Sequence, residues 1–215
     1  PAFNANHIAT KIVIYDHNCD KADYPMSILS DAQASQYIDG SAFHRYDGDI
    51  SALSTVHNAF PAKNLYFTEQ WTQSTGDFGG DLQWHLKNII IGSTKNWSKV
   101  ALEWNLANDP NYQPHTDGGC SECKGAITVN STESYMKNVA YYIIAHASKF
   151  VPSGSVRVQT NEVDGISNVA FRTPAGKIAL ICANDLNQTK IVNLRINGKW
   201  AVINLPAKSV ATYVF

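Results

Sequence analysis

The stretch Asn64-Leu-Tyr-Phe-Thr-Glu-Gln-Trp71 joins a short apolar, aromatic-rich run to an acid and an indole. Pro61 precedes the run and polar residues follow it, so Leu65–Phe67 is predicted to be a buried strand. A carboxylate just past such a strand, with Trp71 beside it, favours an acid that faces a bound sugar ring. The alternative is a strand that simply ends on a polar residue, and this stretch alone leaves both open.

Three more apolar runs suggest strands, and helical patterns separate them. Each predicted strand ends on polar or aromatic side chains. The predicted strands are Lys11–Tyr15, Ile38–Phe43, Leu65–Phe67 and Lys99–Leu102, and the groups at their ends are Asp16-His17-Asn18, His44-Arg45-Tyr46, Glu69 and Glu103-Trp104-Asn105. The continuous apolar run Lys11–Tyr15 predicts a strand buried on both faces. The predicted helices are Ala32–Tyr37, a turn from Asp49 or Ser51 through Ala59, Asp77–Gly92 and Glu133–Phe150.

Four strand–helix alternations with polar strand ends are typical of half a (β/α)₈ barrel, in which functional groups gather where the strands end. Residues 1–150 are therefore predicted to be such a half-barrel. A barrel needs eight strands, so we expect its N-terminal half to be missing from this sequence.

Beyond Phe150 the pattern changes to short β-rich segments without helices. Asn197-Gly198 is a strong hairpin signal between two of these segments. Residues 151–215 are predicted to form an antiparallel β domain, so the fold class is α/β followed by all-β.

Charge and cysteine content narrow the possible partners. The formal net charge is -1 and no run of Lys or Arg occurs, which argues against nucleic acid as a partner. No apolar run approaches the ~20 residues of a transmembrane segment. The pair Cys120 and Cys123 has only His115 nearby, so a local disulfide in an oxidising compartment is favoured over a metal site. Cys19 and Cys182 are predicted to be lone thiols.

Five stretches together resemble the C-terminal half of family 30 glycoside hydrolases, which include glucosylceramidases and endo-β-1,6-glucanases. The stretches are Ile12-Val-Ile-Tyr-Asp-His-Asn18, Tyr37-Ile-Asp-Gly-Ser-Ala-Phe-His-Arg-Tyr46, Tyr66-Phe-Thr-Glu-Gln-Trp71, Leu102-Glu-Trp-Asn-Leu-Ala107 and Tyr141-Tyr-Ile-Ile-Ala-His-Ala-Ser-Lys-Phe150. The resemblance implies strands 5–8 of a TIM barrel followed by a β-sandwich, without a cofactor or metal. It also implies a secreted or periplasmic protein, with a lysosomal one as the alternative.

The resemblance assigns roles to particular residues. Glu69 matches the nucleophile of a retaining β-glycosidase and Tyr46 matches its phenolic partner. The implied substrate-binding residues are Asp16, His17, His44, Trp71 and Trp104. Simpler interpretations remain open: Tyr46 as a strand-end residue, Trp104 as core and His17 as an ordinary loop histidine.

One feature of the family pattern is absent. Retaining hydrolysis needs a second carboxylate that protonates the leaving oxygen. The family places it in an Asn-Glu-Pro motif, which does not occur here, and Asn161-Glu162-Val163 lies in the β domain without the proline. Glu122 and Glu133 lie in the loop region, and Glu103 is expected to point away from Trp104. We therefore expect the chain to carry the nucleophile, to be nearly inactive alone, and to need the missing half-barrel as a partner.

The substrate is the least determined part of the prediction. Asp117–Lys124 and Phe67–Trp71 are more similar to endo-β-1,6-glucanases, so a β-linked glucan is favoured over glucosylceramide or a simple β-glucoside. A hypothesis of another class is a non-catalytic carbohydrate-binding fragment, for which Trp200 is the one exposed-aromatic candidate in the β domain.

Overall fold

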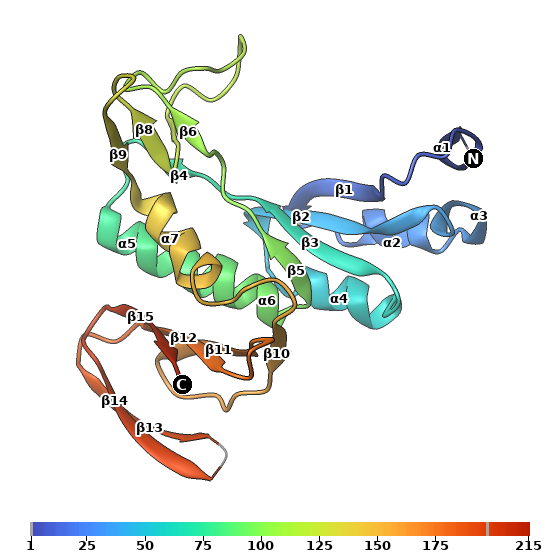
Figure 1. Ribbon diagram of the computed structural model, residues 1–215. Coiled ribbons are helices and arrows are strands. Elements are labelled where there is room, and N and C mark those ends of the chain that lie inside the picture. The colour runs from blue at the N-terminus through green and yellow to red at the C-terminus, as the bar shows by residue number, and fades with distance from the viewer. Residues whose placement is uncertain (1, 197) are drawn as a thin grey trace. The chain divides into compact units, whose positions relative to one another are not determined.

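The computed structural model describes residues 2–196 and 198–215, and the chain forms two compact units. The first comprises Pro1–Gln70 and Gly92–Leu102, and the second comprises Trp71–Ile91 and Glu103–Phe215 (Figure 1). The predicted domain boundary between residues 150 and 151 does not coincide with this division and stays a prediction. Within the described residues, no helix has the length and apolar character needed to cross a membrane.

The first unit is built on a four-stranded, wholly parallel sheet. Its strands lie side by side in chain order: β1 (Ile12–Cys19), β2 (Ile38–Gly48), β3 (Asn64–Glu69) and β5 (Ser98–Ala101). The helices of this unit are α1 (Ala2–Ala5), α2 (Asp23–Leu29), α3 (Ala32–Ser35), α4 (Ala52–Ala59) and α6 (Gly92–Lys95). The four strands predicted from sequence are confirmed, and they are half of the eight that close a (β/α)₈ barrel.

The core of this unit lies between the sheet and α4. Leu53 and Val56, three positions apart on α4, are fully buried and pack with Phe43 and Leu65 from the sheet. Asp31 accepts hydrogen bonds from the backbone N–H groups of Gln33 and Ala34, so it caps α3 as its sequence position predicts.

Burial of the first strand on both faces was a wrong prediction. Ile12 and Val13 are 37% and 39% exposed. Among the described residues β1 pairs only with β2, so it is an edge strand whose apolar side chains lack a second neighbour.

The second unit begins with the strong helical pattern after Asp77. The structure divides this pattern into α5 (Phe78–His85) and a π-helix, η1 (Leu86–Ile91), and the helical path continues through Gly92 into α6. The predicted stop at Gly92 is therefore wrong. Gly92 is not among the glycines with positive φ, so it does not form the left-handed cap that ends many helices.

Short strands form between residues 107 and 137: β6 (Ala107–Asn108), β7 (Cys123–Lys124), β8 (Ile127–Val129) and β9 (Tyr135–Lys137). The earlier strand β4 (Thr72–Gln73) pairs with β7. The helix predicted from Glu133 begins only at Val139 and forms α7 (Val139–Ser148). Tyr135–Lys137 pairs with β8 instead, so sheet pairing overrides the helical periodicity there.

The short β-rich segments predicted from sequence form six strands of the sandwich within the described residues. They are β10 (Val156–Val158), β11 (Ile166–Arg172), β12 (Ile178–Asn184), β13 (Lys190–Ile196), β14 (Lys199–Leu205) and β15 (Val210–Val214). One sheet has the order β10-β11-β12-β15, and β13 and β14 form a separate antiparallel hairpin. Ile196 pairs with Lys199, which confirms the hairpin, while Asn197 itself lies outside the described residues.

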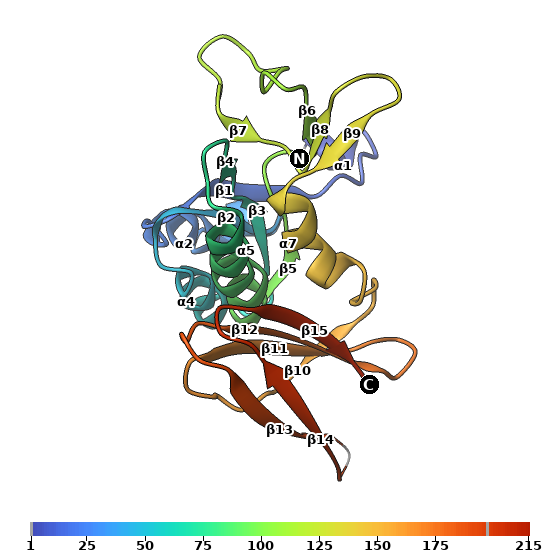
Figure 2. The ribbon, with the colours of Figure 1, turned by 90° about the vertical axis from the view of Figure 1, so that its left-hand side faces the viewer.

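Helices and sandwich pack together within the second unit (Figure 2). Phe78 on α5 meets Tyr142 on α7 edge-on, and η1 contacts β11 and β12. An ion pair joins Lys87 to Asp185, and His146 on α7 contacts the hydroxyl of Thr212 on β15. Within this unit the sandwich therefore packs against α7 and η1.

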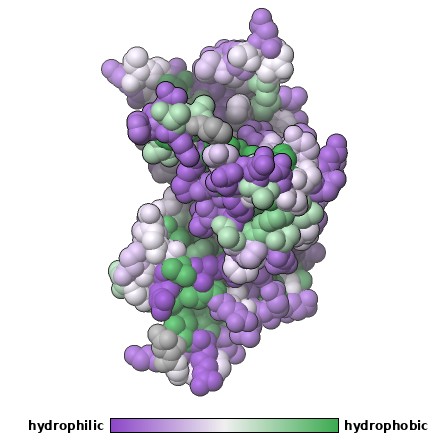
Figure 3. Space-filling view, turned by 90° about the vertical axis from the view of Figure 1, so that its right-hand side faces the viewer, coloured by the Kyte–Doolittle hydropathy of each residue, from purple (hydrophilic) through white to green (hydrophobic). Residues whose placement is uncertain are grey.

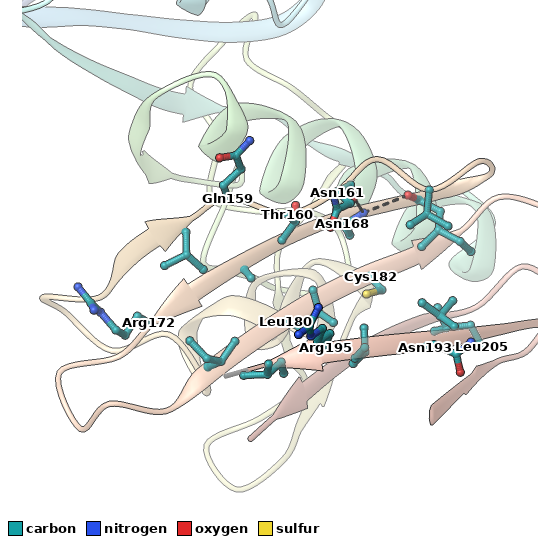
Figure 4. A pocket seen from close by; sticks show the side chains of 18 residues that line it. Gln159, Thr160, Asn161, Asn168, Arg172, Leu180, Cys182, Asn193, Arg195 and Leu205 are labelled. Atoms are coloured by element: carbon teal, nitrogen blue, oxygen red, sulfur yellow. Dashed lines mark hydrogen bonds between the residues drawn. The ribbon is translucent and has the colours of Figure 1, made fainter. Parts of the chain in front are cut away.

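A groove of about 440 Å³ separates the sandwich sheet from the β13–β14 hairpin. Figure 4 shows Leu180 and Cys182 on the sheet and Leu205 on the hairpin among its lining side chains. Apolar side chains also gather over the sandwich in the lower part of the face in Figure 3. The groove belongs to the interior of the sandwich, and the described residues that line it include no acidic side chain.

Candidate active site

Two side chains from neighbouring strands meet at the C-terminal end of the parallel sheet. The hydroxyl of Tyr46 on β2 donates to Oε1 of Glu69, the last residue of β3, over 3.1 Å. The register brings them together, because Phe43 pairs with Phe67 and, after an irregularity, His44 pairs with Glu69. Tyr46 is 41% exposed, and Glu69 is the only glutamate of the first unit.

Asp16 connects the ends of three adjacent strands. Its Oδ1 lies 3.1 Å from Nε2 of His44 on β2 and accepts from the hydroxyl of Thr68 on β3 over 2.7 Å. Asp16 itself has a φ of 53°, in the left-handed region, which Asp tolerates better than most residues. Sequence reasoning missed Thr68, and its only sequence signal is its place directly before Glu69.

His17 follows Asp16 on β1, and its ring lies near that of His44, with centroids 6.4 Å apart. The His44 ring also meets the Tyr46 ring edge-on at 6.2 Å. The first unit thus gathers the predicted residues Asp16, His17, His44, Tyr46 and Glu69 at one edge of its sheet.

The two predicted indoles belong to the second unit. Trp71 and Trp104 are joined by a parallel β-bridge, which fixes the relative position of their backbones. Trp104 is 46% exposed, so its side chain does not form part of a core in this structure.

A buried ionisable pair lies directly before Trp104. Nδ1 of His85, at the end of α5, lies 2.9 and 3.0 Å from the two carboxylate oxygens of Glu103. Both side chains are almost fully buried, and this burial raises the pKa of Glu103 above its usual range, while the hydrogen bond from His85 opposes the rise. Sequence analysis assigned no role to His85, although its position eight residues after a capping Asp77 placed it on a helix.

The CxxC segment forms a disulfide between Cys120 and Cys123. Gln73 of β4 pairs with Cys123 of β7, and the Gln73 side-chain amide donates to Glu122 over 2.8 Å. Strand pairing and this hydrogen bond therefore hold the disulfide-bonded segment against Gln73, two residues after Trp71. Within the described residues no three His, Cys, Asp or Glu side chains are arranged to hold a metal ion.

A parallel β/α array whose adjacent strands end on a carboxylate and a phenol is typical of barrel enzymes. In this class the functional groups lie at the C-terminal ends of the strands. Two family models match the chain: the glycosyl hydrolase family 30 TIM-barrel domain over residues 1–151 and the family 30 beta sandwich domain over residues 154–213. The chain belongs to glycosyl hydrolase family 30.

The relatives that match most or all of this chain include both endo-1,6-beta-glucanases and glucosylceramidases. It is 33% identical to endo-1,6-beta-D-glucanase neg1 of Aspergillus fumigatus over 100% of this chain and 44% of that protein. It is 25% identical to mouse lysosomal acid glucosylceramidase over 84% of this chain and 37% of that protein. The solved structure of the endo-beta1,6-glucanase BT3312 matches 100% of this chain and 50% of its own, with 33% identity and a TM-score of 0.90. The chain therefore spans half or less of the length of these relatives.

Proposed function

We propose that this chain carries the nucleophile half of the active site of a retaining β-glycoside hydrolase that acts on β-1,6-linked glucan. The observation that supports it is the hydrogen bond between Tyr46 and Glu69 at the ends of neighbouring parallel strands. In this mechanism Glu69 attacks the anomeric carbon and forms a covalent glycosyl-enzyme, which water then hydrolyses. The phenol of Tyr46 holds the carboxylate in position for attack.

The remaining residues of the site are proposed to bind sugar. Asp16, His17 and His44 offer carboxylate and imidazole groups to sugar hydroxyls, and Asp16 is oriented by His44 and Thr68. Trp71 and Trp104 offer flat apolar faces to the C–H side of a pyranose ring.

The general acid is proposed to come from the other half of the barrel. Retaining enzymes place their two carboxyl groups about 5–5.5 Å apart, and each protonation step needs the second one. The first unit has no other glutamate, and Glu103 is buried against His85. A half-barrel that pairs with the exposed edge of β1 would both close the sheet and supply this acid.

The proposed substrate class follows the relatives that match the whole chain, because the Aspergillus fumigatus protein and BT3312 are both named endo-β-1,6-glucanases. Glucosylceramide or a simple β-glucoside is the second candidate, supported by the match to mouse glucosylceramidase. With the complete barrel, a comparison of β-1,6-glucan with glucosylceramide as substrates distinguishes the two.

A covalent trap tests the nucleophile without requiring the general acid. The trap is a 2-deoxy-2-fluoro-β-glucoside with a dinitrophenolate leaving group. Because dinitrophenolate departs without protonation, the chain alone can form the glycosyl-enzyme. We expect the added mass to map to Glu69 and to be lost in Glu69→Gln. Labelling at another carboxylate, or undiminished labelling of Glu69→Gln, overturns the assignment. Turnover of an ordinary aryl β-glucoside by the chain alone, abolished in Glu69→Gln, overturns the proposed absence of the acid.

The chain also has a proposed domain boundary and a proposed cellular compartment. We place the boundary between the half-barrel and the sandwich at residues 150 and 151, near the break at Pro152. The Cys120–Cys123 disulfide supports an oxidising compartment, hence a secreted or periplasmic protein, with a lysosome as the alternative.

A non-catalytic role in carbohydrate binding is the competing function. It is favoured by Trp200 on the β13–β14 hairpin, which is 67% exposed, although Arg195 lies over its ring. Loss of polysaccharide binding in Trp200→Ala, with binding retained in Glu69→Gln and Trp104→Ala, would favour this function.

A further inference from the structure

We propose that the buried His85–Glu103 pair is a positioning device that fixes the side of its strand on which the Trp104 indole emerges. Its consequence for sugar binding rests on the proposed function, but the positioning itself does not.

The pair locks the Glu103 side chain in one orientation. The side chains of His85 and Glu103 are 5% and 3% exposed, and Nδ1 of the imidazole lies within 3.0 Å of both carboxylate oxygens. An ionisable carboxylate removed from water needs a hydrogen-bonding partner, so rotation of Glu103 away from His85 is strongly disfavoured.

The fixed orientation of Glu103 determines the direction in which the next side chain, that of Trp104, points. Glu103 is partly buried, whereas Trp104 is exposed and forms a parallel β-bridge, as residues of extended backbone do. Successive side chains of such a segment point to opposite faces. With Glu103 held toward α5, the Trp104 side chain points to the exposed face, while its backbone is held by the β-bridge to Trp71.

The helix that carries His85 is itself fixed on both sides of this residue. Trp84 lies edge-on to the imidazole at 5.1 Å, and Asp81 lies one turn earlier on α5. Directly after His85 the π-helix η1 places Leu86, Ile89, Ile90 and Ile91 in the core. His85 therefore cannot withdraw from Glu103 without unpacking these apolar side chains.

Stability alone does not account for an ionisable pair at this place. Well-packed apolar residues in the same volume are often as stabilising as a buried ion pair, or more so. The pair differs from such residues in imposing a single hydrogen-bonded geometry, which a leucine at position 103 would not.

Fluorine NMR of the chain labelled with 5-fluorotryptophan tests the proposal. The chain contains five tryptophans, and a Trp104→Phe variant identifies the Trp104 resonance. We expect the Trp104 resonance to shift and broaden in Glu103→Leu and to stay close to its original position in Glu103→Gln, which retains an acceptor for His85. The Trp97 and Trp200 resonances should not move in either variant.

Two further variants separate positioning from general destabilisation. His85→Leu/Glu103→Leu removes the pair without leaving a buried charge, so it stays folded even if Glu103→Leu does not. We expect a displaced Trp104 resonance in this double variant. Ile143→Ala weakens the core of the same unit but keeps both members of the pair, so it should leave the Trp104 resonance in place. An unmoved Trp104 resonance in the double variant, or an equal displacement in Ile143→Ala, overturns the proposal.

Adding a β-1,6-linked gluco-oligosaccharide distinguishes failure of the positioning from failure of the sugar assignment. We expect the oligosaccharide to shift the Trp104 resonance of the original chain and not that of the double variant. If the original chain shows no such shift, the proposed sugar contact of Trp104 is wrong, and the spectra recorded without sugar alone decide the positioning.

Discussion

The hydroxyl of Tyr46 is the group whose removal most directly tests the proposed nucleophile. In Tyr46→Phe the ring remains but the 3.1 Å hydrogen bond to Glu69 is lost. A hydrogen bond to a charged group contributes about 1.5–3 kcal/mol, so the rate of covalent trapping should fall roughly tenfold to a hundredfold. The measurement is the rate of mass gain with the dinitrophenyl 2-fluoroglucoside.

Tyr213→Phe is the matched control for that experiment. It removes a phenolic hydroxyl that donates to the backbone of Asn204 in the sandwich, so it leaves the hydrogen bond of Glu69 unchanged. Its trapping rate should equal that of the unchanged chain. Equal rates for Tyr46→Phe and Tyr213→Phe would show that Tyr46 does not act on the nucleophile.

The free thiols Cys19 and Cys182 should be unreactive in the folded chain. Burial removes the thiolate from water and raises the pKa of each to about 12, compared with about 8.5 in an unfolded chain. Without reductant, a thiol-specific disulfide reagent at pH 8 should titrate neither thiol in the folded chain and both in denaturant. Because the folded pKa is the higher one, the stabilising contribution is complete below pH 8.5 and is lost as the pH rises toward 12. A native thiol that reacts at the denatured rate would contradict this burial.

Functional side chains at the ends of predicted strands could be identified from the sequence. The residues that hold such side chains in place could not. Glu69 was recognisable because it follows an apolar run, and Tyr46 because it matches the family pattern; the structure brings the two into contact. Thr68 and His85 were missed because only the folded chain shows that they contact Asp16 and Glu103.

Among the elements, α5 is stabilised by Asp77, the N-cap residue that lies directly before its first turn. Oδ2 of Asp77 accepts from the backbone N–H of Gly80 over 2.6 Å, and the backbone of Asp77 is extended as in a typical N-cap. Asp77→Ala should reduce the free energy of unfolding by about 1 kcal/mol, measured by urea denaturation. Asp77→Asn keeps an acceptor and should lose much less, and equal losses for both substitutions would contradict the capping role.

The elements themselves were largely predictable, and the errors have local physical causes. Strong periodicity identified α5 and α7, but Tyr135–Lys137 pairs with β8 because its backbone groups find partners there before the helix begins. The apolar run of β1 was interpreted as doubly buried because such composition is typical of central parallel strands. Its exposure shows that composition does not reveal whether a neighbouring strand is present.

At the scale of the whole molecule, the unpaired side of β1 has consequences for solubility. An exposed apolar edge strand is a template for pairing with another chain. Val13→Lys places a charge on that edge and should lower self-association of the chain, measured by sedimentation velocity. Val129→Lys, on β8, which is paired on both sides, is the matched control at another exposed valine. Equal effects of the two substitutions would indicate that general surface charge, rather than the β1 edge, governs association.

The same edge predicts how activity is completed. If the barrel closes through β1, a polypeptide covering the four preceding strands of a family 30 relative should bind this chain and supply the missing carboxylic acid. We expect hydrolysis of an aryl β-glucoside only when both polypeptides are present, and its loss when the chain carries Glu69→Gln. Val13→Lys should weaken the assembly, because a buried lysine at the new strand interface has to lose its hydration without gaining a partner. Assembly that tolerates Val13→Lys would show that the two halves do not join at β1, while a mixture that assembles and remains inactive would show that the acid is not supplied from that side.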